Sequence, residues 1–198
     1  LGVDQDDHVI RRRVRQKVAF FVDDLASAIA TLNEVRAIRR CTDGLRVVIV
    51  GHSAGAHTAA LLATDPQYLR RSGAHVDLHA LVALAGPYDL PLGHRNVRGK
   101  FDRVRDDREA NPVSLATGET PPVLLLHGTD DSTVSPTHTA KFAAKLNAVG
   151  VPVTVHNYDG ANHVSLVGAL ATPVRFLHPV HEDIAGFLAD LRSVRTCR

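Results

Sequence analysis

Several residue types are scarce in this chain of 198 residues, and each scarcity excludes a class of function or binding site. Tryptophan is absent and aromatic residues make up 5%, so the broad stacking surfaces that bind single-stranded nucleic acid are not expected. Lys and Arg number 23 against 21 Asp and Glu, and a net charge of +2 gives no strong basic field. We therefore expect no nucleic-acid partner.

Cysteine and candidate metal ligands are also few. Cys41 and Cys197 cannot build a disulfide framework or a zinc cage. Histidines stand three or four residues apart in two places: His75 with His79, and His178 with His181. Neither pair has a convincing third ligand, so we expect no metal and no other cofactor.

The chain contains no apolar stretch long enough to span a membrane and no signal-peptide core near its N-terminus. These two features favour a cytoplasmic location. Methionine is absent, so we expect a processed, trimmed or partial chain.

Apolar residues make up 44% of the chain and charged residues 22%, which suits one globular domain over 1–198. Short apolar runs alternate with amphipathic stretches, and this alternation predicts a mostly parallel α/β sheet with helices on both faces. The expected strands are 45–50, 80–85, 123–127 and 151–158. The expected helices are 18–32, 54–63, the stretch from Ser135 to Gly150, and the tail from Val180. Residues 1–16 form an atypical N-terminal segment, and 86–121 form an excursion between strands.

The sequence Gly-His-Ser-Ala-Gly at 51–55 directly follows the first expected strand and precedes a helix. A serine in this position stands on a tight, strained turn that projects its hydroxyl, and glycines at 51 and 55 avoid clashes with the strand and helix. The helix N-terminus favours a developing negative charge. Ser53 is therefore the candidate nucleophile.

A serine nucleophile needs a base and an acid that orients the base. Asp130 and Asp131 follow the third expected strand, and His163 follows the fourth. Because the carboxyl ends of parallel strands share one edge of the sheet, these groups are expected to meet there. The chain order Ser, Asp, His differs from that of chymotrypsin and of subtilisin.

These motifs resemble those of α/β-hydrolases of the carboxylesterase type, close to bacterial esterases related to feruloyl esterases and kynurenine formamidases. The resemblance runs from about Val18 to the C-terminal helix. It rests on GHSAG, on ALAGPYDL at 83–90, on PPVLLLHGTDDSTV at 121–134 and on GANHVSL at 160–166. It implies that Asp131 rather than Asp130 is the acid, that His163 is the base, and that the Ala54 N–H binds the oxyanion.

The chain departs from that family near its N-terminus. No His-Gly-Gly loop, which supplies further oxyanion donors in the family, is present, and only 52 residues precede Ser53. The four expected strands resemble the last four of the family's eight, so the N-terminal half of the sheet is truncated or replaced. Residues 8–15 are a candidate replacement strand. Without one, the strand at 45–50 leaves an exposed edge, which predicts a homo-oligomer.

The expected activity is hydrolysis of short-chain carboxylic esters through an acyl-enzyme, with a small-molecule ester as the partner. The excursion at 86–121 is too short for a large lid, which favours short acyl groups. His52 and Tyr88 are candidate substrate-binding residues, although local packing explains either one. Two alternatives stay open: an amidase, aryl-formamidase or peptidase with the same triad, and an impaired fragment that acts as a binding or dimerising scaffold.

Overall fold

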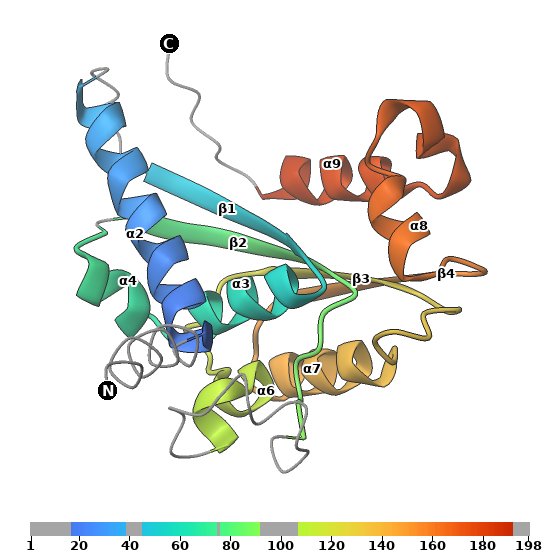
Figure 1. Ribbon diagram of the computed structural model, residues 1–198, viewed down its shortest axis with the longest axis horizontal. Helices are drawn as coiled ribbons and strands as arrows, with labels where there is room; N and C mark the ends of the chain where they lie inside the picture. The colour runs from blue at the N-terminus through green and yellow to red at the C-terminus, as the bar shows by residue number, and fades with distance from the viewer. Residues whose placement is uncertain (1–16, 39–44, 75, 92–106, 192–198) are drawn as a thin grey trace, which may run out of the picture.

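Four parallel strands form the centre of the fold, which we describe from a computed structural model (Figure 1). The structure describes residues 17–38, 45–74, 76–91 and 107–191. The strands are β1 (Leu45–His52), β2 (Val76–Leu84), β3 (Val123–Gly128) and β4 (Val153–Tyr158). They lie in the order β1-β2-β3-β4, and every neighbouring pair is parallel. The predicted parallel sheet is confirmed.

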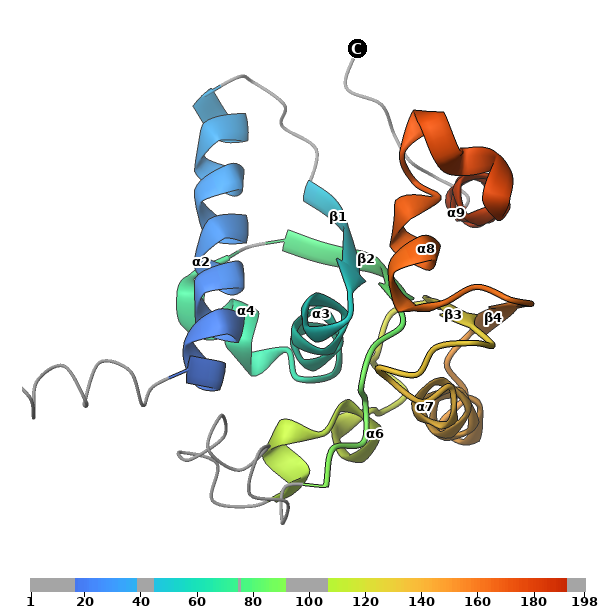
Figure 2. The same cartoon turned by 45° about the vertical axis from the view of Figure 1, so that its right-hand side comes forward.

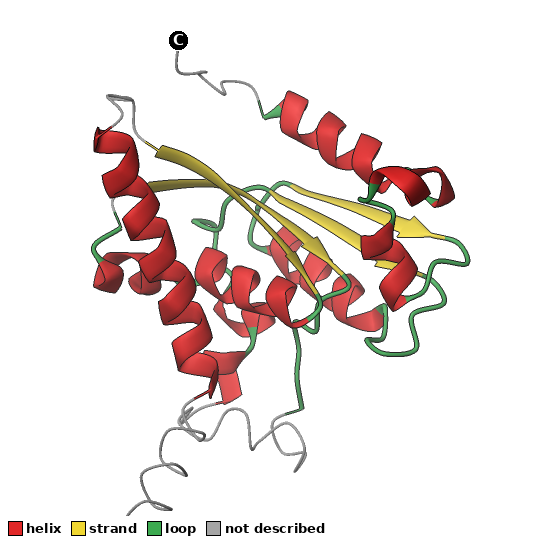
Figure 3. Ribbon diagram, turned by 45° about the horizontal axis from the view of Figure 1, so that its top comes forward, coloured by secondary structure: helices red, strands yellow, loops and turns green. Residues whose placement is uncertain are grey.

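Helices cover both faces of this sheet, as predicted (Figures 2 and 3). One face carries α2 (Lys17–Ile38), α3 (Ala54–Thr64), α4 (Gln67–Ser72), α6 (Pro112–Leu115) and α7 (Thr137–Ala148). The other face carries α8 (His163–Gly168) and α9 (Val180–Asp190). Two 3₁₀ turns, η1 (Asp107–Ala110) and η2 (Thr172–Leu177), lie in the connections.

The strand side chains alternate between two apolar cores. Leu81, Leu125 and their neighbours pack with α2, α3 and α7, whereas Leu84 and Leu126 pack with α8 and α9. Both faces of β3 are buried, so β3 is a continuous apolar run rather than an alternating one. Because the strands are parallel, the carboxyl ends of β1, β3 and β4 lie at the same edge of the sheet. The residues that follow these strands are therefore brought close together.

Some local predictions differ from the structure. β2 begins at Val76 rather than at residue 80. The first half of this strand contains the polar Asp77 and His79, so it is not a continuous apolar run and was not predicted. The six-residue helices α4 and α8 are too short for their periodicity to be recognised. The predictions for residues 1–16, the two cysteines and the central part of the excursion (92–106) fall outside the described residues.

The apolar face predicted for α2 is only partly in the core. Val22, Ala26 and Ile29 are buried, but Phe21 and Leu32 are more than half exposed. None of the helices that the structure describes is long and apolar enough to cross a membrane.

The sheet has two edge strands, β1 and β4. Val50 on β1 is 52% exposed, which is high for an apolar strand residue. Among the described residues no further strand pairs with β1, so its outer backbone groups have no partner in the sheet.

Candidate active site

Ser53 stands on a strained turn between β1 and α3. Its φ of 56° and ψ of −123° lie in a region that residues with side chains seldom adopt. Its backbone N–H donates to the Leu84 carbonyl oxygen at 2.9 Å, which ties the turn to the end of β2. The strained serine turn predicted from the sequence is therefore present.

The two glycines beside Ser53 are not equivalent. A Cβ on Gly51 would lie 2.5 Å from the Gly55 carbonyl oxygen, so only glycine fits at position 51. A Cβ on Gly55 would meet nothing within 4 Å of the described structure. The prediction that both glycines avoid clashes holds for Gly51 and is wrong for Gly55 in this chain, because the space beside Gly55 is open.

The three predicted polar residues form one continuous hydrogen-bonded chain. His163 Nε2 lies 2.9 Å from Ser53 Oγ, and His163 Nδ1 lies 2.7 Å from Asp131 Oδ2. Because a carboxylate only accepts hydrogen bonds, Nδ1 carries the proton and Nε2 is free to accept from the serine hydroxyl. The Asp131 side chain is fully buried, while the His163 side chain keeps 13% of its surface exposed, which leaves the serine end accessible.

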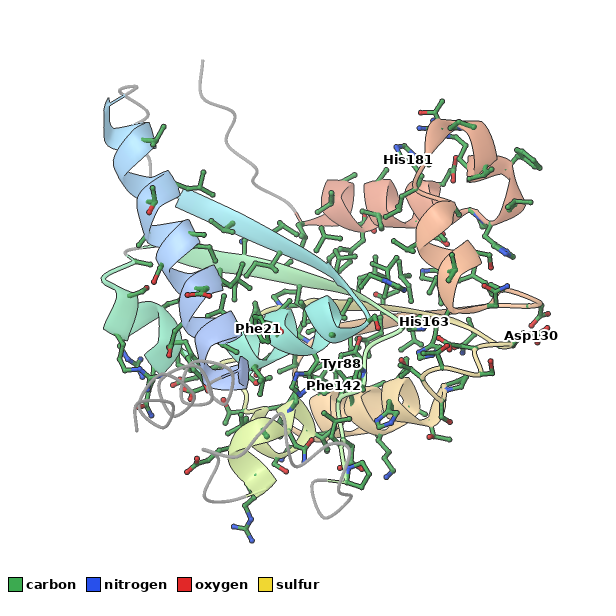
Figure 4. The ribbon with its side chains drawn as sticks, in the orientation of Figure 1. Phe21, Tyr88, Asp130, Phe142, His163 and His181 are labelled. Atoms are coloured by element: carbon green, nitrogen blue, oxygen red, sulfur yellow. The ribbon has the colours of Figure 1, made fainter. Side chains whose placement is uncertain are left out.

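Asp131 is held as a carboxylate by backbone donors. Its Oδ1 accepts the N–H groups of Thr133 and Val134, each at 2.9 Å. Burial acts to raise its pKa, but the hydrogen bonds from Val134, His163 and Thr133 outweigh burial and hold the pKa of this carboxyl below its usual value. The competing Asp130 is exposed and lies at the loop tip beyond His163 (Figure 4).

Two loops are joined closely enough to bring Asp131 and His163 together. Asp130 N–H donates to the Ala161 carbonyl oxygen at 3.0 Å, and Gly160 N–H donates to Thr129 Oγ1 at 3.0 Å. A Cβ on Gly128 would overlap the Ala161 carbonyl group, so this approach requires glycine at the end of β3. The geometry therefore depends on β3 and β4 pairing in register.

His163 is fixed by its own helix start and by His52. It is the first residue of α8, whose N-cap Asn162 accepts the Val164 and Ser165 N–H groups. His52 Nε2 donates to the His163 carbonyl oxygen at 2.9 Å, and the two rings lie 4.6 Å apart. Burial lowers the pKa of His52, which favours the neutral ring. One His52 nitrogen thus tethers the base loop, and contact with substrate stays a prediction.

Tyr88, the second candidate substrate-binding residue, is a core residue in the structure. Its side chain is fully buried, and its ring lies 4.7 Å from that of Phe142, as Figure 4 shows. A Cβ on Gly86 would press against the Tyr88 ring, so the tyrosine packs under the turn that ends β2. The structure therefore places the Tyr88 ring in the core, and its contact with substrate stays a prediction.

The helix α3 begins directly after Ser53. Ala54 is the first residue of α3 and is exposed, and the first N–H groups of a helix have no acceptor within that helix. In the described ranges, no three His, Cys, Asp or Glu side chains lie close enough together to hold a metal ion.

One further polar residue lies next to the predicted acid. His127 at the end of β3 contacts Asp131, with Nε2 3.3 Å from Oδ2. Its four-residue spacing from Asp131 was visible in the sequence, but the direction of its ring was not.

Comparison with known proteins agrees with this geometry. The sequence profile of the prolyl oligopeptidase family matches residues 10–189. The chain belongs to this family. Esterase LipC of Mycobacterium tuberculosis is 28% identical over 175 residues, which cover 73% of this chain and 43% of LipC. Esterase LipQ of the same organism is 31% identical, over 75% of this chain and 39% of LipQ.

Solved structures share the fold. A thermophilic esterase from Thermogutta terrifontis with bound propionate aligns with a TM-score of 0.73 at 22% identity, over 92% of this chain and 69% of the other. The carboxylesterase type suggested by the motifs is thus the type of its relatives. The chain spans less than half the length of the curated relatives LipC and LipQ.

The contrast between Gly51 and Gly55 gives a direct test of the turn. We expect Gly51→Ala to destabilise the fold by several kcal/mol or prevent folding, because its Cβ would collide with backbone. Gly55→Ala should be neutral or raise stability by up to about 1 kcal/mol, since alanine is the better helix residue. Thermal unfolding of both variants measures this, and an equal loss in both would contradict the open space beside Gly55.

Proposed function

We propose that this protein is a serine carboxylester hydrolase that acts on short acyl esters. The observation that carries the proposal is the hydrogen-bonded chain from Ser53 through His163 to Asp131, with the serine on a strained turn at a helix start. The named esterases among its relatives support ester hydrolysis.

In this mechanism Ser53 Oγ attacks the ester carbonyl carbon while His163 Nε2 accepts the serine proton. Asp131 holds the Nδ1–H tautomer of His163 and stabilises the imidazolium that forms. His163 then donates the proton to the leaving alcohol, which leaves an acyl group on Ser53. A water molecule then attacks this acyl group while His163 accepts a proton from it. The bond between Ser53 Oγ and the acyl carbon breaks, His163 returns the proton to Ser53 Oγ, and the carboxylic acid is released.

The Ala54 N–H is proposed to stabilise the tetrahedral oxyanion. It stands at the N-terminus of α3, where unpaired N–H groups and the helix dipole favour negative charge. Removing one such donor from other serine hydrolases costs about 10²–10³ in turnover. A backbone donor cannot be removed by side-chain substitution, so the support for Ala54 is its position at the helix start.

A short acyl group is the proposed substrate feature. The segment between β2 and β3 is too short to add a large lid for a long lipid chain. The structural neighbours from Thermogutta terrifontis were solved with propionate and with butyrate bound, which are three- and four-carbon acids. For this chain the acyl length remains part of the proposal.

The ester preference is also a proposal, because the same three groups serve amide hydrolysis. The family takes its name from peptidases, whereas the similar curated proteins are named esterases. A p-nitrophenyl ester and a p-nitroanilide with the same acyl group separate the two activities. We expect faster turnover of the ester.

Ser53→Ala tests the nucleophile. We expect turnover of p-nitrophenyl acetate to fall by about 10⁶, or to background, with an unchanged unfolding temperature. The parent protein should also be labelled at Ser53 by a fluorophosphonate, and the variant should not. A folded variant with activity close to the parent, or a parent that neither labels nor hydrolyses, would favour the scaffold alternative.

Asp131→Asn and Asp130→Asn form a matched pair for the acid. The asparagine at 131 can donate to His163 and so favours its wrong tautomer, which costs about 10⁴ in the comparable protease case. Asp130 is exposed and points away from His163, so Asp130→Asn should retain activity near the parent value. The reverse ranking of kcat would show that the acid is misassigned by one residue.

We further propose that the β1 edge is a surface on which two copies of the chain associate. β1 is the more apolar of the two edge strands, and Val50 is 52% exposed. The other edge strand, β4, carries the polar Thr154, His156 and Asn157, which protect an edge from pairing. Three apolar residues of α2 are also exposed: Phe21, Leu32 and Val35.

Association is expected to be broken by Val50→Lys and not by Val155→Lys on β4. A charge at the centre of an apolar interface is costly, whereas the same charge on the opposite edge faces water. Light scattering across a dilution series measures the mass, and esterase activity is recorded in parallel. A monomeric parent at high concentration, or equal effects of both variants, would refute association at β1.

A further inference from the structure

His127 is a buried polar residue that the mechanism above does not use. It lies in β3, and its side chain is fully buried. Nδ1 lies 2.6 Å from Thr139 Oγ1 on α7. Nε2 lies 3.0 Å from the Val134 carbonyl oxygen and 3.3 Å from Asp131 Oδ2. Both ring nitrogens are therefore occupied by polar partners.

These contacts define which nitrogen carries the proton. Both partners of Nε2 only accept hydrogen bonds, so Nε2 carries a proton and shares it between them. Burial lowers the pKa of His127, so the ring is neutral and Nδ1 accepts from the Thr139 hydroxyl. The hydrogen bond from Thr139 on α7 to His127 Nδ1 thus fixes the orientation of the ring, and the ring in turn directs its Nε2–H towards Asp131.

Asp131 is consequently held at both oxygens. Its Oδ1 is fixed by the Thr133 and Val134 N–H groups, and its Oδ2 is shared between His163 Nδ1 and His127 Nε2. The Val134 backbone donates to Oδ1 and accepts from His127, so the same ring also fixes the turn that presents the carboxylate. Without His127, His163 would be the single partner of Oδ2 among the described residues.

We propose that His127 is a positioning residue: its neutral imidazole orients the Asp131 carboxylate towards His163, and Thr139 fixes its tautomer. This inference rests on the proposed function for its kinetic consequence. The contact between His127 and Asp131 does not depend on catalysis, and the proton NMR resonance of His163 Nδ1–H reports on it without any turnover.

The test compares His127→Phe with His127→Gln. Phenylalanine fills the buried space but has no donor, whereas the glutamine amide places an N–H near the position of Nε2. We expect kcat/KM for p-nitrophenyl acetate to fall by about 10- to 100-fold in His127→Phe, as for the loss of one hydrogen bond to a charged acceptor. In His127→Gln, kcat/KM should stay close to the value of the parent protein. The downfield proton NMR resonance of His163 Nδ1–H should shift or broaden with phenylalanine and persist with glutamine.

His57→Phe is the matched control. His57 is also buried, and its Nε2 also binds a backbone carbonyl, that of Ala110, at 2.8 Å. Its loss should lower the unfolding temperature and leave kcat/KM and the His163 resonance unchanged. An equal kinetic loss in this control, or unchanged kcat/KM and resonance in folded His127→Phe, would overturn the proposal.

If His127→Phe does not fold, Thr139→Val and Thr139→Ser take its place. Valine removes the hydroxyl at nearly constant volume and serine keeps it, so only valine should reduce kcat/KM and perturb the resonance. Equal behaviour of the two would overturn the proposal. A parent without esterase activity would refute the proposed function alone, because the resonance still reports whether His127 orients Asp131.

Discussion

The hydrogen bond between His163 Nδ1 and Asp131 Oδ2, at 2.7 Å, joins two loops that are 32 residues apart in the chain. It exists because β3 and β4 pair in register and because Gly128 lets the Ala161 backbone approach the end of β3. The same imidazole reaches Ser53 at the end of β1, which lies two strands away from β3. The site is therefore a property of the sheet edge rather than of any one loop.

The polar groups around Asp131 act in the same direction although they come from different elements. Backbone N–H groups after β3 fix one carboxylate oxygen, and histidines from β3 and α8 contact the other. Burial acts to raise the pKa of the Asp131 carboxyl, but the hydrogen bonds from Val134, His163 and Thr133 hold this pKa below its usual value, which favours the charged form. A charged acid is what a histidine base requires.

The side of the sheet beyond β1 is organised differently. Val50 is half exposed, Ala54 is exposed, and the space beside Gly55 is open in the described structure. Val50 precedes the serine turn, Ala54 and Gly55 follow it, and among the described residues no strand pairs with β1 on its outer side. The relatives LipC and LipQ are more than twice the length of the region aligned with this chain. The contacts that hold Asp131 and His163 thus all lie among described residues.

The sequence by itself determined the parallel α/β fold and the strand-serine-helix turn, and it placed the candidate acid and base after the third and fourth strands, because apolar runs and glycine-flanked polar residues are local signals. Choosing Asp131 over Asp130 already required the resemblance, since both follow β3. Only the tertiary structure decided where rings point. It buried Tyr88 against Phe142, turned His52 towards the His163 carbonyl, and aimed His127 at Asp131. Ring directions depend on packing between elements distant in the chain, which no local pattern encodes.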